Sequence, residues 1–292
     1  MRRLLYYIVM FLVCGQTYAQ TTFILPAVPD TLRTAEVRAA YLLVHYWDNM
    51  DFMHADVKNV ELEQAFADFV SVLSLGSEEA ARAGVDRLMD RAMVNDSVYR
   101  HFASFAEKYL YDSDSPVANE QLYELFLEHG LASAVYSDAE KMRLRHQFES
   151  VRMNAPGTMA SDFSYELADG TKSTLHNTAE GIPMLLLLYD PDCSHCRDML
   201  FSLRYNSALN LRLREGTIKV LAVYTEEDYD LWKSAADEIP AQWTVCTDRG
   251  MIKERNLYDL RKMPVLYLLD GDKRVALKNT SSKAVAEYLL DN

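Results

Sequence analysis

The sequence predicts a two-domain α+β protein, with an all-helical N-terminal domain followed by an α/β domain built on a mixed central sheet. Apolar residues recur at helical spacing almost throughout residues 31–152. Proline is absent between Asp30 and Ser115, which suits a helical bundle. Beyond residue 153, short apolar runs alternate with amphipathic segments, a pattern typical of a sheet covered by helices.

The chain begins with a pattern typical of a secretory signal peptide, predicted over residues 1–19. Arg2 and Arg3 precede an apolar run, and the small residue Ala19 offers a cleavage point. The run is shorter than the roughly 20 residues that a bilayer span needs. These features favour cleavage over lipid attachment at Cys14 or retention as an uncleaved anchor. The mature protein is therefore expected in the periplasm, without stable membrane insertion.

The composition excludes some partners and some kinds of fold. A net charge of −13 should repel nucleic acid, so no nucleic-acid partner is expected. Signal cleavage would remove Cys14 and leave Cys193, Cys196 and Cys246, which are too few for a disulfide scaffold. The fold must therefore rest on a hydrophobic core, for which 49% hydrophobic residues provide the material.

The helical domain, predicted over residues 20–153, should contain five to seven helices. Asn119 is placed to cap one helix, and Ser137 with Glu140 forms a capping box that opens the last. The expected packing faces are sets of apolar residues at helical spacing: Val37, Tyr41 and Val44; Leu62, Phe66, Phe69 and Leu73; Ala81, Val85, Leu88 and Ala92; Val98, Phe102, Phe105 and Tyr109; Leu122, Leu125, Phe126 and His129.

Two features of this domain allow both a structural and a functional interpretation. Histidines and aspartates lie close together in the sequence, but their spacing matches no helix face and favours solvated loop residues over a metal site: His45, Asp48, Asp51, His54 and Asp56. Aromatic residues in the same region indicate core or groove lining, with a protein-binding face as the alternative: Tyr41, Tyr46 and Trp47.

The second domain, predicted over residues 154–292, begins where Asn154 to Gly157 interrupts the helical pattern. Asp169-Gly170 and Asp270-Gly271 mark hairpin turns. Strands are predicted at residues 163–167, 172–175, 182–189, 218–224, 243–245, 265–270 and 274–278. Helices are predicted after Cys193 and over residues 227–238, 251–257 and 281–290.

The segment Cys193-Ser194-His195-Cys196 follows the most apolar strand and opens a helix. A Cys-x-x-Cys pair in this setting brings two sulfurs within disulfide reach, and the helix N-terminus stabilises a thiolate on the first. His195 can also stabilise that thiolate, whereas the charges of Asp190 and Asp192 would raise its pKa. We therefore expect a redox-active Cys193–Cys196 disulfide that needs no further cofactor.

The second domain resembles the thioredoxin-like domains of exported bacterial thiol–disulfide oxidoreductases of the ResA/TlpA type. The landmarks of this resemblance are Ala155-Pro156, Asp162-Phe163, the Cys-x-x-Cys helix, and Met263-Pro264 before an apolar strand. The resemblance implies that Cys193 is the exposed nucleophile and Cys196 the buried resolving thiol. It also implies a cis Pro264 beside the disulfide, with the backbone of Met263 pairing with an extended substrate segment.

The sequence departs from these relatives at two places. Pro191 and Asp192 stand where relatives commonly carry an aromatic residue, and Leu187 replaces the buried acid of thioredoxin. Another group or water must then move the proton of the resolving thiol. The His before the second cysteine also occurs in oxidising relatives such as DsbA, so a potential above the roughly −270 mV of thioredoxin is expected.

The lead hypothesis is an exported thiol–disulfide oxidoreductase that acts on exported proteins with thiols or disulfides and exchanges electrons with an unidentified redox partner. The alternative is a non-catalytic partner-binding protein on a thioredoxin-like scaffold. A permanent disulfide, a zinc site and a copper-delivery site are further interpretations of the cysteine pair. A peroxidase is disfavoured, because Asp190 occupies the position where such an enzyme needs a threonine near the attacking cysteine. No metal site is predicted.

The sequence leaves the roles of Cys246 and of the helical domain undecided. Cys246 is either a small buried hydrophobe or a third redox thiol. The helical domain resembles an uncharacterised domain found upstream of such thioredoxin-like modules, on the segments Arg38 to Leu42 and Tyr46 to Asp48. That resemblance implies no known activity.

Overall fold

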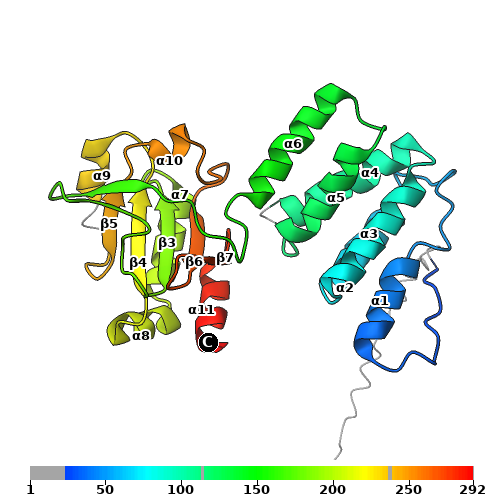
Figure 1. The fold of residues 1–292 in the computed structure, drawn as a ribbon, viewed down its shortest axis with the longest axis horizontal. Helices are drawn as coiled ribbons and strands as arrows, with labels where there is room; N and C mark the ends of the chain where they lie inside the picture. The colour runs from blue at the N-terminus through cyan, green and yellow to red at the C-terminus, as the bar shows by residue number, and fades with distance from the viewer. Residues whose placement is uncertain (1–23, 113–114, 236–238, 292) are drawn as a thin grey trace, which may run out of the picture. The chain divides into compact units, whose positions relative to one another are not determined.

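The computed structural model describes residues 24–112, 115–235 and 239–291, which divide into two compact units between Ala118 and Asn119 (Figure 1). The predicted signal peptide, with Cys14 and the cleavage point at Ala19, lies outside the described residues. Within them, no helix combines the length and the apolar character needed to cross a bilayer. The predicted fold class is confirmed, since a helical N-terminal region precedes an α/β region with a mixed sheet.

The regular elements in the described part of the first unit are all helices, and polar side chains define where several of them begin. Asn59, Ser77 and Asn95 each accept a hydrogen bond from a backbone N–H of the helix that follows, which satisfies donors that have no partner inside the helix. The elements are α1 (Ala35–His45), α2 (Val60–Leu73), α3 (Glu78–Ala92), α4 (Asp96–Ala106) and a short π-helical turn, η1 (Glu107–Tyr111).

The core of this unit is rich in aromatic side chains. Trp47 packs edge-on against Phe69 and Phe102, with ring centroids 5.6 Å and 5.0 Å away, and Tyr46 donates a buried hydrogen bond to the backbone of α2. Tyr46 and Trp47 are therefore core residues. The predicted packing face of the first helix is wrong at Val37, which is half exposed.

Leu43 occupies the core position of α1 because Gly84 lets α3 approach its backbone closely. A Cβ at Gly84 would lie 3.1 Å from the Leu43 carbonyl oxygen.

The two histidines singled out in the sequence, His45 and His54, each contact a nearby aspartate. Asp48 accepts hydrogen bonds from His45 at 2.7 Å, from Arg87 at 2.8 Å and from Arg91 at 3.1 Å. Burial alone would raise the pKa of Asp48, but the hydrogen bonds from His45 and Arg87 lower it below its ordinary value. His54 pairs separately with Asp51 at an exposed position. In the part of the chain that the structure describes, no group of three or more His, Cys, Asp or Glu side chains is arranged to hold a metal ion.

The second unit begins with two helices and continues into a mixed sheet, which has seven strands within the described residues. The strand order is β2-β1-β5-β4-β3-β6-β7, with β3, β4 and β5 parallel to one another and the other pairings antiparallel. Its strands are β1 (Ser164–Leu167), β2 (Lys172–Thr174), β3 (Met184–Tyr189), β4 (Lys219–Tyr224), β5 (Thr244–Thr247), β6 (Val265–Leu269) and β7 (Val275–Leu277). Its helices are α5 (Glu120–Ala132), α6 (Asp138–Arg152), α7 (Ser194–Arg204), α8 (Ser207–Glu215), α9 (Tyr229–Ala235), α10 (Met251–Glu254) and α11 (Ser282–Asp291).

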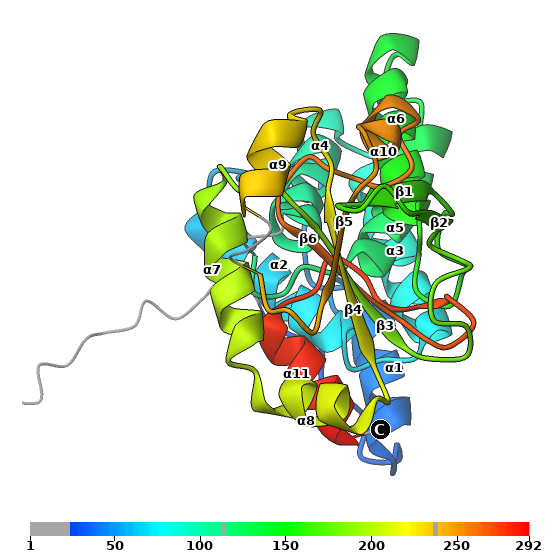
Figure 2. The same ribbon diagram turned by 90° about the vertical axis from the view of Figure 1, so that its left-hand side faces the viewer.

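Both faces of this sheet are buried at β3, and all six residues of this strand are therefore apolar or aromatic. Leu186 and Leu188 point to one face, where they meet Ile252 of α10, whereas Leu185 and Leu187 point to the other. The second face is covered by side chains of α7, α8, α9 and α11, and Figure 2 shows these helices along one side of the sheet. No helix was predicted at the position of α8.

A buried lysine ties the two leading helices of this unit to the sheet. Lys278 follows β7, pairs with Glu120 at 2.7 Å, and donates to the carbonyl oxygens of Ser150 and Val151 at 3.1 and 2.9 Å. These bonds satisfy two carbonyl groups at the end of α6. Helices α5 and α6 therefore pack with the sheet as one compact unit, although the change of sequence pattern falls later. The domain boundary between residues 153 and 154 stays a prediction.

Candidate active site

The Cys-x-x-Cys segment lies where the central strand β3 passes into α7. After Tyr189 the chain makes a tight turn, in which the N–H of Cys193 donates to the carbonyl oxygen of Asp190 at 3.1 Å. Cys193 is the N-cap residue of α7 and has an extended backbone, while its carbonyl accepts the first helical hydrogen bond, from Arg197. The first cysteine therefore sits at the positive end of the helix dipole.

The two thiols of this segment have different environments. Cys193 is half-buried, Cys196 is fully buried, and both are free in this structure. The backbone N–H of Asp190 points at the Cys196 sulfur, with an N···Sγ distance of 3.5 Å. Burial raises the pKa of Cys196 to about 12, and a hydrogen bond with Cys193 and the negative charge of Asp190 act in the same direction. Cys196 is therefore a protonated thiol in the reduced protein at neutral pH.

The segment Met263-Pro264 lies against the first cysteine. Strand β6 runs antiparallel to β3, and the pairing of Leu188 with Val265 brings the start of β6 beside the end of β3. The Met263–Pro264 peptide bond is cis. The Cys193 thiol donates a weak hydrogen bond to the Met263 carbonyl oxygen, at an Sγ···O distance of 3.8 Å. Residues 70 positions apart are thus brought together by the sheet register.

The remaining residues singled out in the sequence lie around this pair. His195 and Asp192 have exposed side chains on the first turn of α7 and in the loop before it, and the N–H of Asp192 donates to the Asp190 carboxylate at 3.0 Å. Their effect on thiolate stability stays a prediction. Leu187 is fully buried and packs with the helices that cover the second face, so its position has no acid function.

Asp190 is the site residue whose role the sequence did not reveal. Its position after an apolar strand indicated a charge near the cysteines, and we expected that charge to act on the exposed thiol. The structure instead directs its backbone N–H to the buried Cys196, because the turn after β3 folds back over the first turn of α7.

Cys246 lies on β5 and belongs to the core on the opposite face of the sheet from Cys196. It is fully buried, and burial, followed by the charge of Asp248, raises its pKa well above the ordinary value. The sheet between the two sulfurs prevents direct exchange in this conformation. The structure therefore supports the interpretation of Cys246 as a small buried core residue.

Comparisons with known proteins show which families and folds this chain is similar to. A family model described as "Domain of unknown function (DUF5106)" matches residues 14–154. The chain is similar to the crystal structure of a thioredoxin-like protein from Bacteroides caccae, with 34% sequence identity and a TM-score of 0.88, over 93% of this chain and 99% of that chain. No curated protein matches the chain.

Two further solved structures are similar to part of the chain. The C-terminal domain of an uncharacterized protein from Bacteroides fragilis is 37% identical, over 47% of this chain and 99% of that one, with a TM-score of 0.46. The thioredoxin domain of a thiol-disulfide oxidoreductase from Bacteroides vulgatus is 18% identical, over 46% of this chain and 98% of that one, with a TM-score of 0.41.

Proposed function

The chain belongs to the family of the thioredoxin-like protein from Bacteroides caccae, and on this premise we propose that it is a thiol–disulfide oxidoreductase whose reactive centre is Cys193 and Cys196. One observation carries the proposal. An accessible thiol at a helix N-terminus lies 3.8 Å from the Met263 carbonyl, with a second, fully buried thiol one turn further along the same helix. A permanent disulfide would need neither the accessible sulfur nor the adjoining Met263-Pro264 segment.

The reaction follows from the different environments of the two thiols. In the reducing direction, the Cys193 thiolate attacks one sulfur of a substrate disulfide and forms a mixed disulfide, and the other substrate sulfur leaves as a thiolate that takes a proton from water. Cys196 then gives its proton to water and its thiolate attacks the Cys193 sulfur, which breaks the mixed disulfide, so that the second substrate sulfur leaves as a thiolate and takes a proton from water. The second substrate thiol is released, the substrate has gained two electrons, and the protein holds a Cys193–Cys196 disulfide. The oxidising direction is the reverse of these steps.

The substrates are proposed to be exported proteins, held with an extended segment beside Met263 and Pro264. The N-terminal pattern of residues 1–19 supports export to the periplasm, and an unidentified redox partner would return the cysteine pair to its starting state. No cofactor beyond the cysteine pair is needed. Export predicts that the mature protein isolated from cells begins at Gln20, which N-terminal sequencing would test.

Trapping of the mixed disulfide tests the proposal directly. Cys196→Ser removes the resolving thiol, so covalent complexes with substrate proteins should accumulate and disappear on reduction. Cys193→Ser is the matched control, because it keeps the buried thiol and removes the nucleophile. If the two variants show the same absence of complexes, and the wild type fails to speed insulin reduction by dithiothreitol, the protein is a non-catalytic binding protein.

The direction of electron flow depends on the potential of the pair. His195 lies on the first turn of α7 beside Cys193, and a side chain that favours the reduced form of the pair would make the disulfide the stronger oxidant. We therefore propose a potential above the roughly −270 mV of thioredoxin. Equilibration with glutathione buffers would measure it, and His195→Ala should lower it.

A further inference from the structure

The segment between α10 and β6 carries Met263 and Pro264, which form the proposed contact for substrate. Its residues 255–264 are all described, and they belong to neither a helix nor a strand. The sheet fixes the downstream end of the segment, because Val265 pairs with Leu188 of β3. The place of Met263 therefore also depends on what holds the upstream part.

Hydrogen bonds to the end of α6 and to the chain just after it hold the upstream part of this segment. Three consecutive residues take part: the Leu257 carbonyl accepts from the Asn154 side chain at 2.9 Å, the Tyr258 hydroxyl donates to the Ser161 carbonyl at 2.7 Å, and the Asp259 carboxylate accepts from the Ser150 hydroxyl at 2.7 Å. Ser150, Asn154 and Asp259 are buried. Because a buried polar group that loses its partner is costly, these bonds fix the segment against α6.

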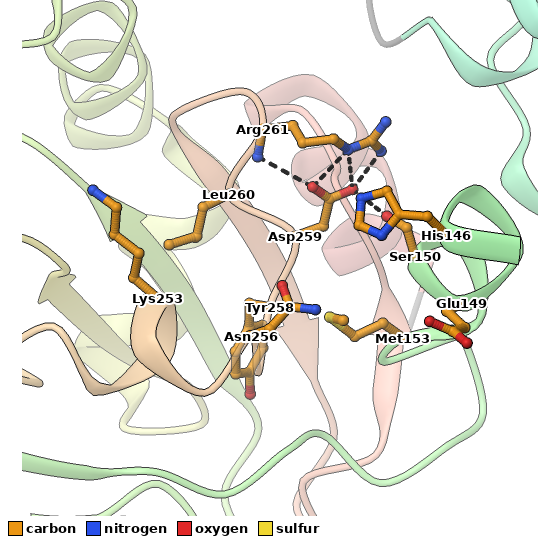
Figure 3. Close-up of a pocket in the computed structure, with 10 residues that line it drawn as sticks. All are labelled: His146, Glu149, Ser150, Met153, Lys253, Asn256, Tyr258, Asp259, Leu260 and Arg261. Carbon is orange, nitrogen blue, oxygen red and sulfur yellow. Dashed lines mark hydrogen bonds and ion pairs between the residues drawn. The ribbon is translucent and has the colours of Figure 1, made fainter. Parts of the chain in front are cut away.

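Asp259 is the residue of this set that lies nearest to Met263 in the chain. Figure 3 shows its carboxylate between the Ser150 hydroxyl and the Arg261 guanidinium. The backbone N–H of Arg261 donates to this carboxylate at 3.1 Å, and the guanidinium Nε donates to both of its oxygens at 2.8 Å. Burial alone would raise the pKa of Asp259, but the hydrogen bonds from Arg261 and Ser150 lower it, so this group is an ion at neutral pH. One carboxylate thus joins α6 to the backbone two residues before Met263.

A displacement of Asp259 would be passed on to the reactive centre. Arg261 precedes Met263 by two residues, so at most about 7 Å of chain separates them. The Met263 carbonyl oxygen in turn lies 3.8 Å from the Cys193 sulfur. Only residues 260–264 lie between Asp259 and the first residue of β6, so the segment has little slack. A shift of about 1 Å in a group that positions substrate can cost about a hundredfold in rate.

We propose that Asp259, anchored by Ser150 of α6, is a positioning residue that holds the Met263 backbone where an extended substrate segment pairs with it beside Cys193. This role rests on the proposed oxidoreductase function and adds residues that govern substrate binding without touching substrate. It also gives the end of the predicted helical domain a part in the reaction, because Ser150 lies within residues 20–153. A bond that only stabilised the fold would affect all disulfide substrates alike.

Two disulfide substrates of different size test this role. A disulfide-linked peptide offers an extended backbone that can pair with Met263, whereas hydroxyethyl disulfide has no peptide backbone. For each protein, kcat/KM with the peptide is divided by kcat/KM with hydroxyethyl disulfide. Ser150→Ala and Asp259→Ala should each lower this ratio about tenfold, the effect of one hydrogen bond to a charged group. The loss should appear in the KM for the peptide, because both cysteines are unchanged.

The double variant shows whether Ser150 acts through Asp259. Ser150→Ala added to Asp259→Ala should change the ratio no further, since the bond between the two residues is already gone. Hydrogen exchange gives a second measurement. Peptides that cover residues 260–264 should exchange faster in Ser150→Ala than in the wild type, because the Asp259 carboxylate holds the Arg261 N–H.

Asn206→Ala is the matched control. It removes another buried hydrogen bond between distant residues, from Asn206 to the Ser282 carbonyl at 2.8 Å, and should keep the ratio whatever it costs in stability. An unchanged ratio in Ser150→Ala and Asp259→Ala would overturn the positioning role, and so would an equal fall in Asn206→Ala, a further loss in the double variant or unaltered exchange of residues 260–264. A wild type that reduces neither substrate would instead overturn the proposed function, and the positioning role with it.

Discussion

Burial holds the Cys196 thiol protonated, and the pH dependence of its alkylation in the reduced protein measures this directly. Burial is the main cause that raises its pKa from the ordinary value of 9.0 to about 12. At pH 7 an ordinary thiol is ionised in about one molecule in a hundred, whereas Cys196 should be ionised in about one in 100,000. The alkylation rate of Cys196 should therefore rise tenfold for each pH unit and continue to rise beyond pH 9.

Asp190→Asn is the perturbation that separates charge from burial. It removes the carboxylate that raises the pKa of Cys196 and keeps the backbone N–H that contacts the sulfur. The rising part of the rate curve of Cys196 should move to lower pH by only a fraction of the interval between pH 9.0 and about 12, because burial, the main cause of the raised pKa, is unchanged. Asp192→Asn removes an exposed charge nearby and should leave the curve of Cys196 in place.

Timed alkylation with iodoacetamide, followed by mass spectrometry of the peptides, gives the rate for each cysteine separately. Because the pKa is read from the pH at which the rate levels off, limited access to the buried sulfur lowers every rate equally and does not disguise the result. A Cys196 rate that levels off near pH 9 would refute the reasoning, and so would identical curves for Asp190→Asn and the wild type.

Three further predictions concern stability. The folded pKa of Cys196 exceeds its unfolded value, so the stability it contributes is present below pH 9 and is lost as the pH rises toward 12. The free energy of unfolding of the reduced protein, measured in urea, should fall by up to about 1.4 kcal/mol per pH unit in this range. The form with a Cys193–Cys196 disulfide should lose less. Lys278→Met should lower the free energy of unfolding in urea by about 3 kcal/mol, because Glu120 loses its buried cation, and adding Glu120→Gln should restore part of it. A similar loss for Lys283→Met, which removes an exposed ion pair, would contradict this reasoning. Gly84→Ala should lower the thermal midpoint, at a cost of about 1–3 kcal/mol, because its Cβ would press on the backbone of α1; a higher midpoint would show that helix propensity outweighs this contact.

Much of the fold was predictable because its signals are local. The capping box at Ser137 and the cap at Asn119 open helices as predicted, since each acts within four residues of its own position. The apolar run of β3 predicted a strand buried on both faces, and the structure confirms it. The prediction at Val37 was wrong because helical spacing alone does not say which face meets a neighbour; the contact of Leu43 with α3 decides that.

The candidate site divides in the same way. The cysteine spacing in the segment Cys193 to Cys196 and its place after a predicted strand indicated a helix N-terminus, and the structure has the segment there. That Cys246 faces the opposite core was not predictable, because it depends on the register of β5 beside β4. The contact of Asp190 with Cys196 likewise depends on how tightly the turn closes.

By itself, the sequence determined the helical and mixed regions, the central strand and the place of the Cys-x-x-Cys pair at the start of a helix, because neighbouring residues encode these through periodicity, capping and spacing. Only the tertiary structure decided which distant groups meet: Met263 with Cys193, and Ser150 with Asp259, which are 109 residues apart. Such contacts arise from strand register and helix packing, where many weak interactions act together and no single short segment specifies the outcome.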